Sequence, residues 1–389
     1  MQDENTQDIL AELDKLLSTP KQSWLLASGI CVDANIPIMV PLTKRVLDLA
    51  GAHVLDKKLV THLNASLPDD TTIEDTLSHL ADHIAIAVRS KDNTSVIGAE
   101  QFSLSDMEKV HDRLLMSIAE TIRWGYVPAD SNETEKIGDY NNPLVTVDGH
   151  QQFISALMDR NRAGVGNRRP PINLFTTNYD TLIEDALALN RISYWDGFSG
   201  GAVAYRSHVY GDKYPERNYQ AHVVKLHGSI DWRAGDDDRL VRVRDKDMYP
   251  EGFDRVLIYP QSTKYLATQR DPFAAQFELL RNSLGEAESV FGICGYGFYD
   301  NHINDEIALS MGRAGSNTTL LVFTKEIPEA LAKWQAESWS NRLYIISEQG
   351  IYVGADGPHT PSDTAAMLDW WKFDGLTRIL TDGAVGYVG

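Results

Sequence analysis

The sequence predicts an α/β fold built on a doubly wound parallel sheet, together with a mostly helical insert. Short apolar runs rich in Ile, Val, Leu and Phe, which are typical of buried strands, alternate along the chain with segments of helical periodicity. Several of these runs end abruptly in glycine or polar residues. Strands that alternate with helices form parallel sheets covered on both faces, so we expect helices on each side of this sheet.

The first 165 residues contain one expected strand and several expected helices. Residues 1–19 have apolar side chains at helical spacing, which predicts an amphipathic helix packed on its own domain or on another subunit. An apolar strand at 23–29 then enters a turn of small residues. From about 55 to 165 the periodicity is mostly helical, and the acids that follow Thr72 mark one helix start. We interpret this region as a helical insert with a polar loop at 128–143.

The second half of the chain alternates strands and helices. Expected strands lie within 172–180, 223–228, 255–260, 289–298, 317–323 and 343–346, and expected helices within 182–189, 273–284 and 328–337. We therefore expect one α/β domain over residues 20–350 that contains the insert. A closing segment follows at 351–389. It carries Trp370, Trp371 and Phe373, and it predicts a core element, an oligomer contact or a partner contact.

The composition excludes several classes of function. The 55 acidic and 36 basic residues give a net charge of −19, and such a surface repels phosphate backbones, so we expect no direct nucleic-acid binding. Cys31 and Cys294 are the only cysteines, which excludes a four-cysteine zinc site and predicts a reducing, cytoplasmic setting. The sequence begins without a basic segment or a long apolar run, so we expect neither secretion nor a membrane span.

Polar residues follow two of the expected strands at the point where each strand ends. The run at 172–180 ends in Asn178 and Asp180, and a later run ends in His227 just before a glycine. Such positions are where an open α/β sheet binds its ligand, and an amide, a carboxylate and an imidazole that meet there would form a catalytic site. Asn178 and Asp180 also suit capping of the next helix, an alternative that leaves His227 unexplained.

Three further features carry weaker predictions. The turn Ala27-Ser28-Gly29 contains one glycine, where a dinucleotide-binding turn normally has several. His79 and His83 lie four residues apart, but no carboxylate pattern completes a metal site, so we expect ordinary core or surface histidines and no metal. The aromatic residues among glycines at 191–222 form either a base-stacking platform or a loop pinned to the core.

Four motifs occur in order along the chain. They are Ala27-Ser28-Gly29-Ile30-Cys31-Val32-Asp33, Thr177-Asn178-Tyr179-Asp180, Lys225-Leu226-His227-Gly228 and Gly295-Tyr296-Gly297-Phe298-Tyr299-Asp300. Together they resemble the sirtuin-like NAD-consuming family over roughly residues 20–350, and in particular its bacterial anti-phage branch. The resemblance implies a Rossmann-like fold.

The resemblance also implies roles for individual residues. Asn178 would position the ribose or the attacking water, His227 would take a proton from a ribose hydroxyl, and Asp180 would orient neighbouring groups or cap its helix. The residues implied in binding the dinucleotide are Ala27, Ser28, Gly29, Ile30, Asp33, Thr177, Gly295, Tyr296, Gly297, Phe298 and Asp300. Two departures matter: the usual Gly-Ala-Gly is Ala27-Ser28-Gly29, and the zinc module of the family's deacylases is missing, which argues against protein deacylation.

We therefore expect an NAD+ hydrolase that releases nicotinamide and ADP-ribose, with NAD+ as the substrate and neither a cofactor nor zinc. By resemblance, the subunit forms a large homo-oligomer and pairs with a HerA-like hexameric ATPase. It would deplete NAD+ in anti-phage defence by abortive infection. The chain has no phosphate-binding Gly-x-x-x-x-Gly-Lys-Ser/Thr loop, so any ATPase activity comes from the partner. Two alternatives remain. One is a non-catalytic module that senses NAD+ or ADP-ribose and regulates a partner. The other is a protein deacylase or ADP-ribosyltransferase.

Overall fold

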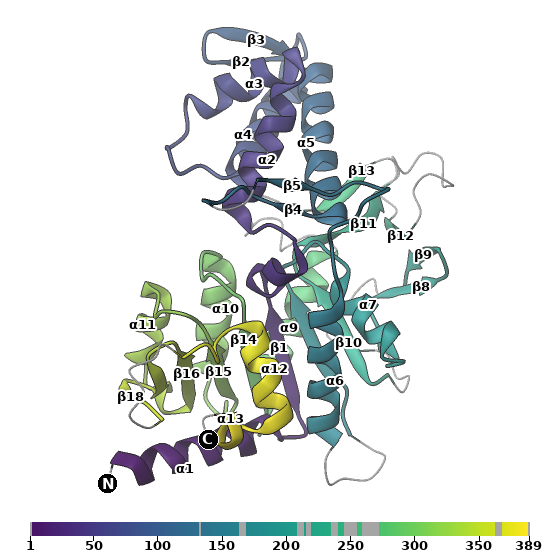
Figure 1. Ribbon diagram of the computed structural model, residues 1–389. Coiled ribbons are helices and arrows are strands. Elements are labelled where there is room, and N and C mark those ends of the chain that lie inside the picture. The colour runs from purple at the N-terminus through teal and green to yellow at the C-terminus, as the bar shows by residue number, and fades with distance from the viewer. Residues whose placement is uncertain are drawn as a thin grey trace.

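A computed structural model describes residues 2–131, 134–162, 169–207, 214, 219–234, 240–244, 255–258, 272–361 and 368–387. Within these residues, nine strands form one large sheet in the order β18-β17-β16-β15-β14-β1-β6-β10-β7 (Figure 1). The strands are β1 (Gln22–Leu26), β6 (Ile172–Thr176), β7 (Tyr194–Trp195), β10 (Ala221–Lys225), β14 (Val290–Cys294), β15 (Thr319–Phe323), β16 (Leu343–Ser347), β17 (Gly350–Val353) and β18 (Asp356–His359). All neighbours from β16 to β7 pair parallel, and only the pairs at the β17–β18 edge are antiparallel. The predicted α/β fold with a mostly parallel sheet is confirmed.

Helices cover both faces of this sheet, as the apolar strands require. Trp24 and Leu25 are neighbours on β1 and belong to two separate buried clusters, because successive side chains of a strand point to opposite faces. The cluster around Trp24 includes apolar residues of α6 (Asp148–Arg162), α7 (Leu182–Leu189) and α12 (Phe373–Asp382). The cluster around Leu25 includes those of α9 (Phe273–Leu284), α10 (Asn301–Met311) and α11 (Glu329–Gln335).

A helical lobe lies beyond the end of the sheet near the β1 turn (Figure 1). It contains α2 (Met39–Gly51), α3 (Val54–Asn64), α4 (Ile73–Arg89), α5 (Leu104–Trp124) and the hairpin of β2 (Thr94–Ile97) with β3 (Glu100–Ser103). Thr72 and Asp75 form a reciprocal cap at the start of α4, as the sequence predicts. The expected loop at 128–143 is wrong in part, because β5 (Lys136–Ile137) pairs there with β4 (Tyr126–Val127). The boundaries of the insert as a domain stay a prediction.

A second, antiparallel sheet has the strand order β13-β11-β12-β9-β8 in the described part of the chain. Its strands are β8 (Phe198–Gly200), β9 (Val203–Arg206), β11 (Gly228–Ala234), β12 (Leu240–Val243) and β13 (Arg255–Ile258). The strand expected at 255–260 therefore belongs to this sheet and not to the main one, and residues 259–260 lie outside the described residues. Gly228 explains the change of sheet, since its φ of +88° turns the chain after β10.

The aromatic residues of the 191–222 stretch are in part core residues. Trp195 and Phe198 are buried, whereas Tyr205 is exposed, and Tyr210 lies outside the described residues. None of the described aromatic side chains of this stretch lines the cavity described below. The loop pinned to the core is therefore the better interpretation for Trp195 and Phe198.

Both ends of the described chain pack on the main body. The helix α1 (Gln2–Leu17) buries Leu10, Leu13 and Leu17 in the Trp24 cluster, and it contacts α13 (Ala384–Tyr387) near the C-terminus (Figure 1). Trp370 of the closing segment is fully buried, so this segment contributes a core element. The remaining helical turns are η1 (Ser28–Ala34) and η2 (Ser340–Arg342). No helix in the described ranges is both long and apolar enough to cross a membrane.

Candidate functional site

The candidate site lies where the strand order of the main sheet reverses. The chain adds β6 and β10 on one side of β1 and later adds β14, β15 and β16 on the other. In open α/β sheets, ligands bind at the carboxyl ends of the strands beside such a reversal. Here the turns after β1 and β14 are in contact, because Gly29 N–H donates to Gly295 O (2.9 Å) and Ala27 N–H donates to Cys294 O (3.1 Å).

Glycine is required on both sides of this contact. A Cβ on Gly29 would lie 2.7 Å from the Gly295 Cα atom. Gly295 itself has a φ of +70°, and its Cβ would lie 2.6 Å from the Ile30 nitrogen. The backbones therefore approach each other more closely than side chains allow. Within the turn Ala27-Ser28-Gly29, the contact with Gly295 therefore requires glycine at position 29.

A cavity of about 1220 Å³ is lined by these turns, by the ends of β6 and β10, by the start of α10 and by residues of the helical lobe and the closing segment. Eleven of the fourteen residues singled out by the sequence line it. They are Ala27, Ser28, Gly29, Thr177, Asn178, Asp180, His227, Gly295, Tyr296, Gly297 and Asp300. Segments that are far apart in the sequence thus meet at one cavity.

Three of the sequence-predicted binding residues do not line the cavity. The chain leaves β1 as the 3₁₀ helix η1, which directs Ile30 into the core and leaves Asp33 exposed to solvent. Phe298 is buried against Tyr296, with ring centroids 4.8 Å apart. Ile30 and Asp33 miss the cavity because a helical turn follows β1, and Phe298 misses it because its ring packs in the core. Their roles in ligand binding stay predictions.

Asn178 is held by the thiol of Cys31. Its Nδ2 atom donates to Cys31 Sγ (3.1 Å), and the thiol in turn donates to Asp180 Oδ2 (3.2 Å). Burial and the neighbouring Asp180 carboxylate raise the pKa of the Cys31 thiol well above its usual value, so the sulfur keeps the proton that it donates. His150 Nε2 lies 3.7 Å from the same sulfur, and burial lowers the pKa of this histidine.

The capping role expected for Asp180 is also present. Its Oδ1 atom accepts from the backbone N–H of Leu182, the first residue of α7 (2.9 Å). Its other oxygen accepts from Cys31. Asp180 therefore joins the start of α7 to the Asn178 side chain through the thiol, which favours an orienting role over direct contact with a substrate.

His227 is fixed by a turn that is bonded to the Asn178 loop. Leu226 N–H donates to Thr176 O (2.8 Å), and Ile230 N–H donates to Tyr179 O (2.9 Å). These bonds join the residues on either side of His227 to those on either side of Asn178, so the two polar ends of β6 and β10 are held at one place. His227 and Asn178 are both buried, with 5% and 8% of their surfaces exposed.

A buried ion pair lies directly behind this loop. Lys225 Nζ donates to the backbone oxygen of Asp180 and lies 3.6 Å from Glu184 Oε1. Burial raises the pKa of the Glu184 carboxyl, while the ammonium group of Lys225 opposes that rise. The pair anchors the Asp180 backbone and does not line the cavity, so its role is structural.

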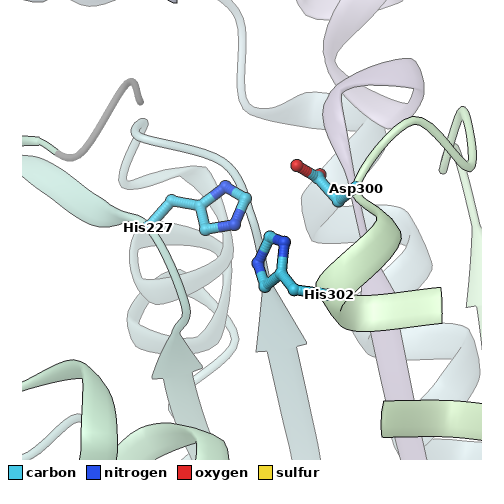
Figure 2. A group of neighbouring side chains, drawn as sticks. All are labelled: His227, Asp300 and His302. Atoms are coloured by element: carbon cyan, nitrogen blue, oxygen red, sulfur yellow. The ribbon is translucent and has the colours of Figure 1, made fainter. Parts of the chain in front are cut away.

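Two further side chains approach His227 from the start of α10. Figure 2 shows Asp300 and His302 pointing toward the His227 ring. One imidazole nitrogen from each histidine and one carboxylate oxygen of Asp300 lie within 4.8 Å of one another. The centroids of the two imidazole rings are 5.7 Å apart.

Sequence reasoning missed several residues of the cavity wall. His302 follows Asp300 by two residues after a glycine turn, and that spacing was the available signal for it. Lys325 follows β15, and Lys372 lies in the closing segment, where the sequence carried no sign of a site. Glu74 belongs to the helical lobe and accepts a hydrogen bond from the Tyr179 hydroxyl (2.9 Å).

Comparison with known families agrees with this geometry. Residues 173–344 match the SIR2-like domain family, from β6 to the start of β16. No curated protein matches the chain. Over residues 173–344 the chain thus resembles a SIR2-like domain, which implies NAD binding and an NAD-using enzyme. The match includes Asn178, His227 and Asp300, whereas the Ala27–Gly29 turn lies before it.

Proposed function

We propose that this protein is an NAD+ hydrolase that cleaves the nicotinamide–ribose bond and releases nicotinamide and ADP-ribose. One observation carries the proposal: the buried side chains of Asn178 and His227 line the same cavity at the strand-order reversal. The SIR2-like match over residues 173–344 supports NAD+ as the ligand.

The chemistry requires little from the protein beyond orientation and a base. As the bond to nicotinamide breaks, its electron pair leaves with the neutral nicotinamide and the ribose acquires oxocarbenium character. Water then bonds to the anomeric carbon and gives up a proton. Asn178 Oδ1, which has no hydrogen-bond partner among the described residues, can accept from this water or from a ribose hydroxyl. His227 is the base, and it accepts this proton directly or through a ribose hydroxyl that passes the proton on.

The cavity suits a dinucleotide in size and in the distribution of charge. Its volume of about 1220 Å³ exceeds the usual range for a drug-sized ligand, which is roughly 300–1,000 Å³. Asp70, Glu74 and Asp75 make the wall near the helical lobe acidic. The pyrophosphate would therefore bind away from these acids, at the glycine turns and near Lys325 and Lys372.

The biological setting is part of the same proposal. The sequence resemblance supports a subunit of an anti-phage system that depletes cytoplasmic NAD+, forms a homo-oligomer and works with a HerA-like hexameric ATPase. The net charge of −19 supports assigning contact with DNA to the partner.

The test is to incubate the purified chain with NAD+, alone and with a HerA-like ATPase, and to follow nicotinamide and ADP-ribose by chromatography. Loss of a positioned base or of water orientation typically costs at least about 100-fold in rate, so we expect Asn178→Ala and His227→Ala each to lose that much. His79→Gln, a histidine substitution outside the cavity wall, is the matched control and should keep the wild-type rate. Full nicotinamide release by Asn178→Ala would contradict the residue assignment. Calorimetric binding of NAD+ without any product, with and without the ATPase, would favour the non-catalytic sensing module.

A further inference from the structure

His302 joins His227, the proposed base, and Asp300, a predicted binding residue, in one group, although the proposed hydrolysis does not require a second histidine (Figure 2). Two imidazoles and one carboxylate converge from two elements, the turn after β10 and the start of α10. Their donor atoms lie within 4.8 Å of one another. Two histidines and one carboxylate form the usual protein ligand set for a first-row transition-metal dication with open coordination positions.

The backbone that carries two of these ligands is firmly held. Asp300 O accepts from the backbone N–H groups of Ile303 and Asn304, both at 3.0 Å, which closes the first turn of α10. The Asn304 side chain donates to Phe298 O (2.8 Å) and accepts from the Tyr296 hydroxyl (3.1 Å). The first turn of α10 is thus tied to the glycine turn after β14. Asp300 and His302 therefore start from a defined backbone position.

The side chains need only a small adjustment to close on an ion. Donor atoms on a tetrahedral ion with bonds of about 2.1 Å lie about 3.4 Å apart, so a pair at the present limit of 4.8 Å must contract by about 1.4 Å. Asp300 and His302 are only partly buried and can rotate, whereas His227 is 5% exposed. The ring of Phe277 packs against His302, with centroids 5.4 Å apart, and restricts that rotation on one side.

A second close histidine pair, His79 and His83, lacks such a ligand set. The ring centroids of His79 and His83 are 4.8 Å apart, but these rings contact the hydroxyls of Ser66 (3.0 Å) and Ser95 (2.8 Å). No carboxylate joins them in a metal-ligating group within the described residues. Among the described residues, the mixed ligand set occurs at the pair that includes His227.

We propose that His227, Asp300 and His302 bind one transition-metal dication of the Zn²⁺ or Co²⁺ type, with the open coordination positions facing the cavity. Two imidazole nitrogens select such ions over Mg²⁺, which prefers oxygen ligands and its own water shell. A metal-bound His227 uses its lone pair for the ion and does not accept a proton. The ion therefore inhibits hydrolysis, a consequence that rests on the proposed NAD+ hydrolase function.

Metal binding is measured first, without any enzymatic readout. The full chain is freed of metal with a chelator and titrated with Co²⁺ by visible absorption and with Zn²⁺ by calorimetry. We expect one ion per chain for both metals and no binding of Mg²⁺ at this site. His302→Gln should weaken the affinity by more than about tenfold, since changes outside the ligand shell alone cost 10–100-fold. Asp300→Asn, which keeps a residue suited to its position before α10, should also weaken it.

His79→Gln is the control for metal capture by an unrelated histidine pair. A loss of affinity in this variant equal to that in His302→Gln would overturn the proposal, and so would unchanged binding in His302→Gln. Melting curves in the presence of chelator establish that each variant is folded.

The inhibition is tested separately, as the ratio of NAD+ hydrolysis with and without Zn²⁺ within each variant. We expect the wild type and His79→Gln to be inhibited at one equivalent of Zn²⁺, and His302→Gln to need more than about tenfold higher Zn²⁺. Metal binding without any hydrolysis, both with and without the HerA-like ATPase, would refute the hydrolase function but support the metal site. Hydrolysis without site-specific metal binding would refute the metal site alone. Specific metal binding that leaves hydrolysis unchanged would refute the inhibition.

Discussion

His222 lies on β10, the strand that ends just before His227, and it is surrounded by aromatic rings. Its ring stacks on Tyr214, with centroids 4.1 Å apart and an interplanar angle of 11°, and it meets Trp195 edge to face. His222 Nδ1 lies 3.0 Å from Asn173 Oδ1 on β6. Burial lowers the pKa of His222 from 6.5 to about 4. The histidine is therefore neutral in the folded protein at pH values where it is protonated in the unfolded chain.

This difference in the pKa of His222 between the folded and the unfolded chain makes the free energy of unfolding depend on pH. As the pH falls from 6.5 to 4, the unfolded chain binds a proton that the folded chain does not, so the free energy of unfolding decreases. Each pKa step is about 1.4 kcal/mol, which gives about 3 kcal/mol over the whole window and about 2 kcal/mol between pH 7 and pH 5. His222→Gln keeps a donor toward Asn173 and removes the titration. It should lose about 2 kcal/mol less than the wild type over this interval.

The measurement is urea unfolding at pH 7 and pH 5, followed by tryptophan fluorescence, for the wild type, His222→Gln and His53→Gln. The last variant changes an exposed histidine on the helical lobe, and it should keep the wild-type pH dependence. Equal pH dependence in the wild type and in His222→Gln would refute the reasoning, because it would mean that burial of this histidine does not oppose protonation.

Three further predictions concern the site and the residues that support it. Cys31→Ala leaves the Asn178 amide without its sulfur partner and should lower kcat/KM for nicotinamide release by about 10–100-fold. Cys31→Ser should stay within about tenfold of the wild type. Equal losses in the two variants would show that the contact with Asn178 does not matter. Gly29→Ala should destabilise the fold by about 1–3 kcal/mol in a denaturation series, because its Cβ would lie 2.7 Å from Gly295 Cα, while Gly149→Ala, which meets nothing within 4 Å, is the control. Lys225→Met leaves Glu184 buried without its cation and should cost about 3–5 kcal/mol, and the double change with Glu184→Gln should restore part of it; no restoration would refute the pairing.

Local sequence patterns were sufficient for most elements of the main sheet. Strands such as β6 and β14 are continuous apolar runs because both faces of a central parallel strand are buried. Their polar or glycine ends mark where burial stops, which is why Asn178, His227 and Gly295 were found as candidates. Helix starts with a cap and nearby acids, such as Thr72, are equally local signals.

Patterns that depend on a distant partner were less informative. The second sheet was missed because short strands such as β8 and β12 have only a few partly buried residues, and their pairing is set by the turn at Gly228. Ile30 and Asp33 lie outside the cavity because of a 3₁₀ turn that the residue pattern of this segment did not predict. The sequence also gave no sign that Cys31 would hold Asn178, since 147 positions separate them.

By itself, the sequence determined the α/β class, the order of its strands along the chain and the polar residues at their ends, because burial and helix capping leave a local periodicity. The tertiary structure alone decided which ends are neighbours. The return of β14 to the side of β1 creates the reversal, brings Gly29 against Gly295 and places Asp300 and His302 opposite His227. These contacts join residues separated by 70 positions or more, and the chain encodes them only through the packing of the whole sheet.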